Sequence, residues 1–354
     1  MKKYGLLAVA VSISCSAWAG QSQFDKLYGV DESNDDLVLI DPTTAQVDSI
    51  GPLGLASVSS LASDAGGVLY GTDTYSLNLV TIDKQSGAAS IVGPTYSGEI
   101  TALAFSPEGS LYGAEAFADT LLTLDPVTGM ASVVGDFGLS DRIITGLAFD
   151  PEGVLYGVAS GNTTAVDSLL VVIDLASGAA TTVGSMGMPY VTGLSFRRDG
   201  TLYGVSRQND ALLSIDTSNG TATNLGSPLP SDRWLGGIEF VSVDVEFDIK
   251  RAGVHRYPSM KSKGVIPVSI YGSDHLDVEQ IDPGTLSLSG LQLKSRGKHL
   301  RCSFDELNYD GILDLMCHFE FSIENWMPAE DRIELTGELY DGTPIAGTQP
   351  LCRK

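Results

Sequence analysis

Short apolar runs alternate with turn residues along most of this chain, and the pattern recurs at a nearly constant spacing. Each repeat begins with Leu-Tyr-Gly, continues with an apolar run ending in Asp and a turn, and then shows a β-branched run ending in Gly. A further apolar run, such as Thr145–Phe149, precedes the next copy. Short apolar runs bounded by turn residues predict β-strands, here four per repeat. The repeated tyrosines are Tyr28, Tyr70, Tyr112, Tyr156 and Tyr203, with spacings of 42, 42, 44 and 47 residues.

Four strands in a period near 42 residues are typical of a β-propeller blade. Five periods therefore predict an all-β fold with a five-bladed β-propeller over residues 20–240. The repeats start at a Leu-Tyr-Gly strand and end with Leu235–Phe240, which matches only the innermost strand. We expect this last segment to complete the first blade, because joining both ends of the ring removes exposed strand edges. The repeated tyrosine rings are expected to wedge between blades.

The order of the strands also assigns the loops to two faces. One face carries stereotyped turns such as Pro107–Gly109 and Asp125–Gly129. The opposite face carries loops that differ in length and composition from repeat to repeat, and we call it the variable-loop face. Binding residues are usually found on variable loops over a rigid scaffold. The candidate functional residues are therefore sought there.

Carboxylates stand at equivalent places in three of these loops. Asp31, Asp73 and Glu115 each lie two residues after the repeated glycine, where the fourth and fifth repeats carry Ala159 and Ser206. Three carboxylates converging near the channel mouth are suited to a hard cation such as Ca²⁺. The alternative is that each accepts hydrogen bonds within its own loop. The two repeats without an acid make the ring incomplete and favour that alternative.

Rare cations and aromatic residues are the other candidates on the variable-loop face. Arg142, Arg207 and Arg233 are suited to clamping a carboxylate ligand, unless each only bridges a local Asp and fixes its loop. Exposed aromatic rings stack on sugars or anchor a protein partner, with ordinary loop packing as the alternative. The aromatic residues in these loops are Tyr75, Tyr96, Phe117, Phe137, Tyr190 and Trp234.

The charge balance excludes several functions. The chain has 44 acidic and 21 basic residues and a net charge of −23, so it lacks the basic footprint that nucleic acids or anionic membranes require. Residues 20–240 contain no histidine and no cysteine. A histidine-based metal site or a serine or cysteine nucleophile with a histidine base is therefore excluded within that segment. Acid–base chemistry by carboxylates, with or without a metal, stays open.

The first nineteen residues have the pattern of a secretory signal peptide. Lys2 and Lys3 precede the apolar run Leu6–Ile13, and Ala17-Trp18-Ala19 supplies small residues at a cleavage site. We therefore expect an exported protein, periplasmic or extracellular. Lipid anchoring at Cys15 is disfavoured because Ser12 stands where a lipoprotein signal has leucine. No later stretch reaches the ~18 apolar residues that span a bilayer.

Residues 241–354 form a second predicted domain, because the repeats end and the composition changes after Phe240. Turn spacing between its apolar runs predicts a small β-sandwich. Its four histidines are dispersed, without the spacing of metal ligands, and are interpreted as structural or surface residues. The predicted strands are Val241–Ile249, Val265–Tyr271, Thr285–Ser289, Leu300–Phe304, Leu313–Phe321 and Ile333–Tyr340.

One segment of this domain has the spacing of a calcium loop. Oxygen ligands stand at positions 1, 3, 5 and 9, glycine stands at position 6, and a backbone carbonyl serves position 7. The alternative is a tight turn around Asp310-Gly311 without an ion. The candidate ligands are Glu306, Asn308, Asp310, the carbonyl of Ile312, and Asp314.

After removal of the signal peptide, three cysteines are left, which allow one internal disulfide in three possible pairings. Cys302 and Cys317 flank the loop symmetrically. Antiparallel pairing through the loop would place them opposite each other, where a disulfide is possible. Cys352 is the competing partner.

The ordered motifs of this domain resemble a C-terminal accessory module of many secreted bacterial proteins. They are Asp248-Ile249-Lys250, Lys261–Val268, Gln280–Pro283 and the Asn308–Gly311 loop followed by Leu313–Leu315. The resemblance implies an Asp-rich, calcium-loop-like segment and no catalytic role. This chain departs from the pattern of the module at two places: it has Glu306 where Asp is usual, and Arg251-Ala252 where Pro-Gly is expected. The repeats likewise resemble the broad group of secreted bacterial β-propeller proteins of unknown function.

Together these patterns predict an exported, non-enzymatic protein that binds a protein or a glycan through its variable-loop face. The rival hypothesis is a metal-dependent hydrolase or lyase that uses Asp31, Asp73 and Glu115 at the channel mouth. The absence of histidine and the incomplete acidic ring favour the binding protein. A third hypothesis, a purely structural surface protein, predicts no ligand.

Overall fold

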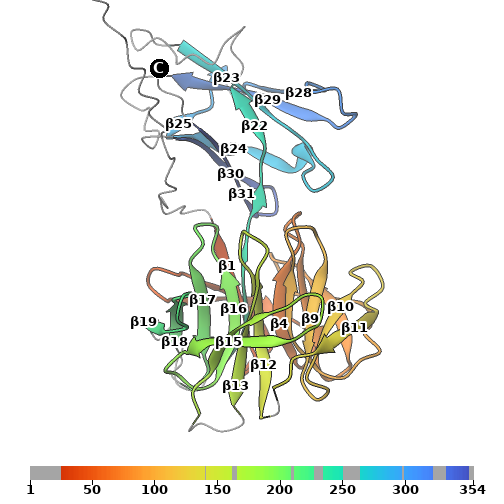
Figure 1. Ribbon diagram of the computed structural model, residues 1–354. Helices are drawn as coiled ribbons and strands as arrows, with labels where there is room; N and C mark the ends of the chain where they lie inside the picture. Colours follow the sequence, from red (N-terminus) through yellow and green to blue (C-terminus); the bar gives the residue numbers. More distant parts are fainter. Residues whose placement is uncertain are drawn as a thin grey trace, which may run out of the picture.

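The computed structural model describes residues 25–139, 141–161, 166–208, 211–226, 234–249, 264–296, 299–321 and 332–350. Their regular secondary structure consists of β-strands, as the sequence predicts, apart from one short 3₁₀ turn, η1 (Val278–Gln280). Figure 1 shows the repeats in the lower part of the molecule and the C-terminal strands above them. The predicted signal peptide, Cys15 and Cys352 lie outside the described residues. No helix in the described ranges is long and apolar enough to cross a bilayer.

The strands β1 to β20 form five four-stranded antiparallel sheets, numbered here in chain order. The first sheet contains β20 (Leu235–Val241), β1 (Lys26–Asp31), β2 (Asp36–Ile40) and β3 (Val47–Pro52). The second contains β4 (Val58–Ser63), β5 (Leu69–Asp73), β6 (Asn78–Ile82) and β7 (Ala89–Pro94). The third contains β8 (Ile100–Phe105), β9 (Leu111–Glu115), β10 (Thr120–Leu124) and β11 (Ala131–Asp136).

The last two sheets of the repeat region follow the same order. The fourth contains β12 (Arg142–Phe149), β13 (Leu155–Gly161), β14 (Leu169–Ile173) and β15 (Ala180–Ser185). The fifth contains β16 (Val191–Phe196), β17 (Leu202–Ser206), β18 (Ala211–Ile215) and β19 (Ala222–Gly226). The innermost strand of each sheet, which we call its leading strand, is β20, β4, β8, β12 or β16. These leading strands contact one another in that order in a closed circle, with β16 again touching β20. The repeat region is therefore a β-propeller.

The two ends of the repeat region meet in the first sheet. β20 pairs antiparallel with β1, with Lys26 opposite Val241 and Tyr28 opposite Glu239. This is the pairing that the order of the repeats predicts. Because the final strand occupies the innermost place of the first sheet, the circle leaves no leading strand unpaired.

Aromatic pairs join neighbouring sheets at the repeated tyrosines. Each ring packs against a phenylalanine on the leading strand of the next sheet, with ring centroids 5.1 to 5.5 Å apart. Such tilted pairs add about 0.5–1.5 kcal/mol each beyond simple burial. The prediction that the rings lie between sheets is therefore confirmed for four copies. The pairs are Tyr70–Phe105, Tyr112–Phe149, Tyr156–Phe196 and Tyr203–Phe240.

Backbone also approaches backbone between sheets at the outer strands. A Cβ at Gly135 in β11 would overlap the carbonyl oxygen of Ser177, which belongs to a turn of the next sheet. In that turn, Gly178 has a φ of +79° and lies against Gly135. The same arrangement recurs at Gly93 with Thr128 and at Gly184 with Asn219. Glycine is required at these contacts because a side chain would push neighbouring sheets apart.

The C-terminal region, residues 243–350, forms two further sheets around one apolar core. The first has the order β21 (Val243–Asp244), β31 (Pro344–Pro350), β30 (Arg332–Leu339), β24 (Ile281–Leu288) and β25 (Leu291–Gln292). The second has the order β22 (Phe247–Ile249), β23 (Gly264–Ile270), β29 (Asp314–Phe321) and β28 (Cys302–Asp305). A separate hairpin joins β26 (Ser295–Arg296) to β27 (His299–Leu300). Phe247, Val268, Leu288 and Phe319 are buried in the core.

The predicted strands of this region overlap observed strands, but the predicted strand Val241–Ile249 is divided among the end of β20, β21 and β22. β31, like the two-residue strands β25 and β26, was not predicted. Its sequence, Pro-Ile-Ala-Gly-Thr-Gln-Pro, begins and ends with proline and has no alternating pattern. The structure pairs it with β30 over its whole length and, in parallel, with β21. Neighbouring strands therefore specify it more than its own residues do.

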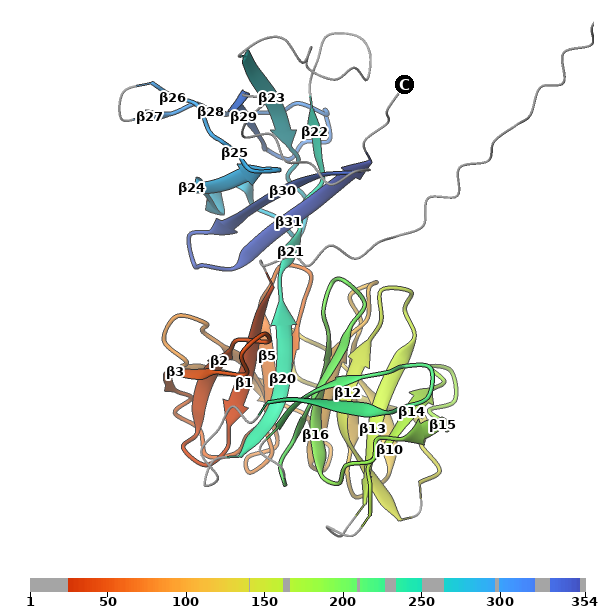
Figure 2. The same ribbon diagram turned by 90° about the vertical axis from the view of Figure 1, so that its left-hand side faces the viewer.

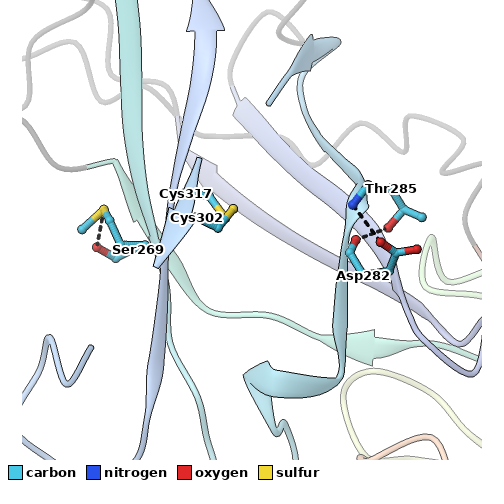
Figure 3. Close-up of a disulfide and its surroundings, with 7 residues drawn as sticks. Ser269, Asp282, Thr285, Cys302 and Cys317 are labelled. Carbon is cyan, nitrogen blue, oxygen red and sulfur yellow. Dashed lines mark hydrogen bonds between the residues drawn. A yellow bond between two sulfur atoms is a disulfide. The ribbon is translucent and has the colours of Figure 1, made fainter. Parts of the chain in front are cut away.

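The disulfide is the pair that loop symmetry indicates. In β28 and β29, Cys302 lies opposite Cys317, and the two sulfur atoms are bonded (Figure 3). The predicted Cys302–Cys317 disulfide is confirmed. Because Cys317 is fully buried in the core while β28 is an edge strand with exposed side chains, the bond attaches that edge to the core.

The C-terminal region packs against the stereotyped-turn face of the propeller. From that face, Lys84 Nζ donates to Thr343 Oγ1 at 2.6 Å and lies 3.4 Å from Asp341. Lys26 Nζ donates to the Gly342 carbonyl at 2.6 Å. Figure 2 shows β20 running straight into the C-terminal region through β21. The variable-loop face therefore lies at the opposite end, uncovered by the C-terminal strands.

A buried carboxyl group ties three sheets together near this junction. Glu239 in β20 accepts hydrogen bonds from Ser63 N and Oγ, at 3.1 and 2.8 Å, and from Ser195 Oγ at 3.1 Å. Burial outweighs these hydrogen bonds and raises the pKa of Glu239 from 4.5 to about 7.

The raised pKa predicts that stability falls as the pH rises. In the unfolded chain the carboxyl ionises near its ordinary pKa, whereas in the folded chain it keeps its proton up to about pH 7. Between these values the folded state binds more protons, so the free energy of unfolding decreases with pH, by up to about 3 kcal/mol from this group. Glu239→Gln should remove this loss. Urea unfolding of the parent and the variant at pH 5 and pH 8 measures this loss of stability. If the variant lost as much stability with pH as the parent, Glu239 would not be its cause.

Candidate functional site

The centre of the propeller opens on the variable-loop face as a hollow of about 510 Å³. Above it, the channel narrows to a space of about 10 Å³ between the five leading strands, which is close to the room one water needs. The hollow is therefore a pocket at the mouth of a nearly filled channel. Its lining residues are Glu32, Asp35, Ala56, Ser57, Ser59, Thr74, Glu99, Thr101, Ile143, Thr145, Thr192 and Arg207.

Threonine hydroxyls line the pocket at equivalent places in three leading strands. Each donates to a carbonyl oxygen of the next leading strand: Thr101 to Ile144 at 2.7 Å, Thr145 to Val191 at 2.7 Å, and Thr192 to Leu235 at 2.9 Å. The next two leading strands break the pattern with Gly236 and Ser59. The hydroxyl of Ser59 is buried without a hydrogen-bond partner.

Glu32 occupies the space that the pattern leaves open. Its Oε1 atom lies 2.5 Å from the position that a Cβ atom would take on Gly236. The carboxylate forms an ion pair with Arg207, whose guanidinium lies 4.8 Å above the ring of Trp234. Burial raises the pKa of Glu32, the Arg207 charge opposes that increase, and Asp35, Asp31 and Glu99 add to it. The pocket therefore contains several carboxylates that repel one another and one cation that is already paired.

A second hollow of about 360 Å³ adjoins the first and shares Arg207 with it. Its other lining residues are Tyr190, Gln208 and Trp234. Trp234 is 50% exposed, and the Arg207 N–H donates to the Tyr190 carbonyl at 2.9 Å. An aromatic shelf thus borders the acidic pocket. Tyr190, Arg207 and Trp234, three of the residues selected from the sequence, come together here.

The three equivalent carboxylates are buried in their own loops. Asp31 accepts from Ser33 N and Asn34 Nδ2, both at 3.0 Å. Asp73 accepts from Tyr75 N at 3.0 Å and from Ser76 Oγ, and Glu115 accepts from Phe117 N at 3.3 Å and from Ala118 N. None of the three lines the pocket. Within the described ranges, no group of three His, Cys, Asp or Glu side chains is placed to hold a metal ion.

The remaining sequence candidates fall outside the pocket. Arg142 donates to the carbonyls of Ala159 and Asp167, at 3.1 and 2.8 Å, and thereby fixes its own loop. Arg233 lies outside the described residues. Phe137 is 2% exposed and belongs to the core between the third and fourth sheets, so its assignment to an aromatic surface was wrong. Tyr75, Tyr96 and Phe117 are at least 80% exposed on the variable-loop face.

Sequence reasoning missed the acidic residues of the pocket, Glu32, Asp35 and Glu99. All three belong to variable loops. The places of Glu32 and Glu99 are not acidic in the other repeats, whereas Asp35 stands seven residues after the repeated tyrosine, as do Asp119 and Asp210. A detectable signal for Glu32 was Gly236, the position where other leading strands carry threonine. A missing side chain next to the channel leaves room for a residue from another loop.

The calcium-loop-like segment curls back on itself. Tyr309 and Gly311 have positive φ angles of 65° and 89°. Glu306 Oε1 accepts from Gly311 N at 2.9 Å, and Asp310 Oδ1 accepts from Ile312 N at 2.8 Å. Asp314 is fully buried and accepts from Gly272 N and Leu307 N, at 3.0 and 2.7 Å. Asp314 therefore fastens the loop to the core, while the exposed oxygens belong to Glu306, Asn308 and Asp310.

Comparison with known proteins supports the repeat. A family described as a repeat of unknown function (DUF6923) matches residues 90–240. Similar solved structures include a chain of a nidogen–laminin complex, with 17% identity, a TM-score of 0.45, and coverage of 61% of this chain and 81% of that one. They also include a gluconolactonase from Xanthomonas campestris, with 15% identity, a TM-score of 0.38, and coverage of 70% and 83%. No curated protein matches this chain.

Proposed function

We propose that this chain is an exported, non-enzymatic binding protein, a five-bladed β-propeller followed by a β-sandwich, whose variable-loop face binds a protein or a glycan. One observation carries the proposal. The pocket at the channel mouth and its aromatic border lie on the face opposite the C-terminal region. Exposed Tyr75, Tyr96 and Phe117 add apolar contact area around it. Surfaces of this kind, rich in Tyr, Trp and Phe, are enriched at binding interfaces.

The Cys302–Cys317 disulfide supports export, because such bonds persist in oxidising compartments. The hydrolase or lyase alternative has no comparable support. Asp31, Asp73 and Glu115, which that alternative requires, each accept hydrogen bonds from their own loops, and none of the three lines the pocket.

The proposal is tested by screening the chain from Gly20 onward against a glycan array and an array of peptides. Any ligand should bind at least tenfold more weakly to the double variant Trp234→Ala, Tyr96→Ala, since truncating an aromatic anchor costs more than about 1 kcal/mol. Val127→Ala is the control, because Val127 is 80% exposed in a turn on the opposite face. Ligands that bind the double variant and the parent equally would place the function elsewhere.

We further propose that the C-terminal loop binds one Ca²⁺. The oxygens of Glu306, Asn308, Asp310 and the Ile312 carbonyl fit a hard cation in donor type, and Asp314 would anchor the loop beneath it.

Calcium titration by calorimetry of the metal-stripped chain should show a single site. It should be lost in Asp310→Ala and kept in Glu279→Ala, an exposed acid of the same region. Saturating calcium should also raise the unfolding temperature of the parent. Binding that survives Asp310→Ala and disappears in Asp73→Ala would instead locate the ion at the propeller. Absence of binding would remove calcium from the proposal.

A further inference from the structure

The chemistry of the channel mouth narrows the class of partner, provided that the variable-loop face binds as proposed above. Within the described residues that line the pocket, the charged groups are Glu32, Asp35, Glu99 and Arg207. Arg207 is paired with Glu32 and stacked on Trp234. The charges of Asp35 and Glu99 are therefore left over, and the pocket has an excess of two negative charges.

The hydroxyls of the pocket add to this bias. Thr101, Thr145 and Thr192 use their hydrogens on carbonyls of neighbouring strands, so they offer a ligand only their oxygen lone pairs. The carboxylates also accept hydrogen bonds only. Apart from hydroxyls such as that of Ser59, an incoming group therefore meets mostly acceptors, which favours a ligand that brings several donors and a positive charge.

The carboxylates lie close enough to affect one another. Asp35, Asp31 and Glu99 all raise the pKa of Glu32 by repulsion, against the effect of Arg207. A cation placed among them would relieve that repulsion. The pocket, at about 510 Å³, is far larger than a bare metal ion requires. It fits instead the head of a long organic cation.

The aromatic shelf supplies the second half of the site. Basic side chains pack their apolar stems on aromatic surface and keep their charged heads among polar groups. Trp234 and Tyr190 offer that surface directly beside the acidic pocket. Exposed Tyr96 and Phe117 add aromatic contact area on the same face.

We propose that the channel mouth receives an arginine or lysine side chain presented by a basic protein partner. The guanidinium or ammonium group lies among Asp35, Glu99 and the threonine oxygens, and its stem packs on Trp234. The net charge of −23 attracts such a partner at long range and raises the association rate.

The test uses fluorescence anisotropy with three labelled peptides of equal length, in which glycine alternates with arginine, lysine or citrulline. Citrulline keeps the shape of arginine and removes its charge. The arginine and lysine peptides should bind at 0.15 M salt, and the citrulline peptide should bind at least tenfold more weakly. The double variant Asp35→Asn, Glu99→Gln should weaken binding of the arginine peptide at least tenfold.

The matched control is Glu108→Gln, Glu152→Gln, which removes the same charge from exposed turns on the opposite face. Its affinity should stay within twofold of the parent. Equal losses in both double variants would show that net charge alone attracts the peptide, and would overturn the inference. A neutral glycan whose binding needs Trp234 but tolerates Asp35→Asn, Glu99→Gln would overturn it and leave the binding function intact. If no peptide and no glycan binds, both proposals fail.

Discussion

Replacing Gly135 by alanine should lower the free energy of unfolding of the chain by about 2–3 kcal/mol, a large loss for one methyl group. The added Cβ would overlap the carbonyl oxygen of Ser177. That oxygen belongs to backbone, and Gly178 beside it is packed against Gly135 in turn. Relief therefore requires the third and fourth sheets to move apart, which disturbs the apolar core between them around Leu121 and Leu147.

Urea unfolding of the parent and the variant, followed by circular dichroism, measures this loss. Gly264→Ala is the matched control, because a Cβ at Gly264 meets no atom within 4 Å and its φ is not positive. The control should change stability by less than about 0.5–1 kcal/mol. If Gly135→Ala proved as harmless as the control, the sheets could not be as closely apposed as described.

Removing the disulfide should destabilise the C-terminal region and leave the propeller intact. The bond closes a loop with a sequence separation of 15 residues, for which the loss is about 3 kcal/mol. The double variant Cys302→Ala, Cys317→Ala avoids burying a new hydroxyl in the core beside Phe319. The apolar clusters of the propeller contain neither Cys302 nor Cys317, so the unfolding temperature of the propeller should not change.

Calorimetry separates the two effects, because the C-terminal transition should shift to lower temperature while the propeller transition stays in place. The parent protein treated with a reductant should show the same shift as the variant. A shift of both transitions would mean that the junction at Lys84 and Asp341 couples them into one cooperative unit. An unchanged C-terminal transition would show that β28 is held without the bond.

The repeats were predictable because their signals are local and recur. Leu-Tyr-Gly, the Asp-to-Gly turns and the terminal glycines each specify a strand or a turn from neighbouring residues, and the phase of the repeats specifies that β20 joins β1. In the C-terminal region, the symmetry around the loop indicated that Cys302 lies opposite Cys317. Strand β31 lacks such a signal: its own residues do not alternate, and its parallel pairing with β21 depends on residues far earlier in the chain.

The site was less predictable, and the reason is geometric. Equivalent positions drew attention to Asp31 and Asp73, whose side chains turn out to cap their own loops. The pocket depends instead on positions where the repeats differ. Glu32 reaches the channel because Gly236 has no side chain. Arg207 is held by contacts with Glu32 and Trp234, which come from other loops. A pattern within one repeat contains no information about such contacts between repeats.

The closure of the propeller by β20 has a mechanical consequence. Lys26 and Val241 are paired at the end of the β1–β20 ladder that faces the C-terminal region, so the chain enters and leaves the propeller at the same end. A force that pulls Lys26 and Val241 apart would break the residue pairs between β1 and β20 one after another. Lys26 belongs to the first pair that would separate, and its contacts with Gly342 and Glu338 resist that separation. A load pulling on the variable-loop face against the C-terminal region would instead be shared along the length of β20.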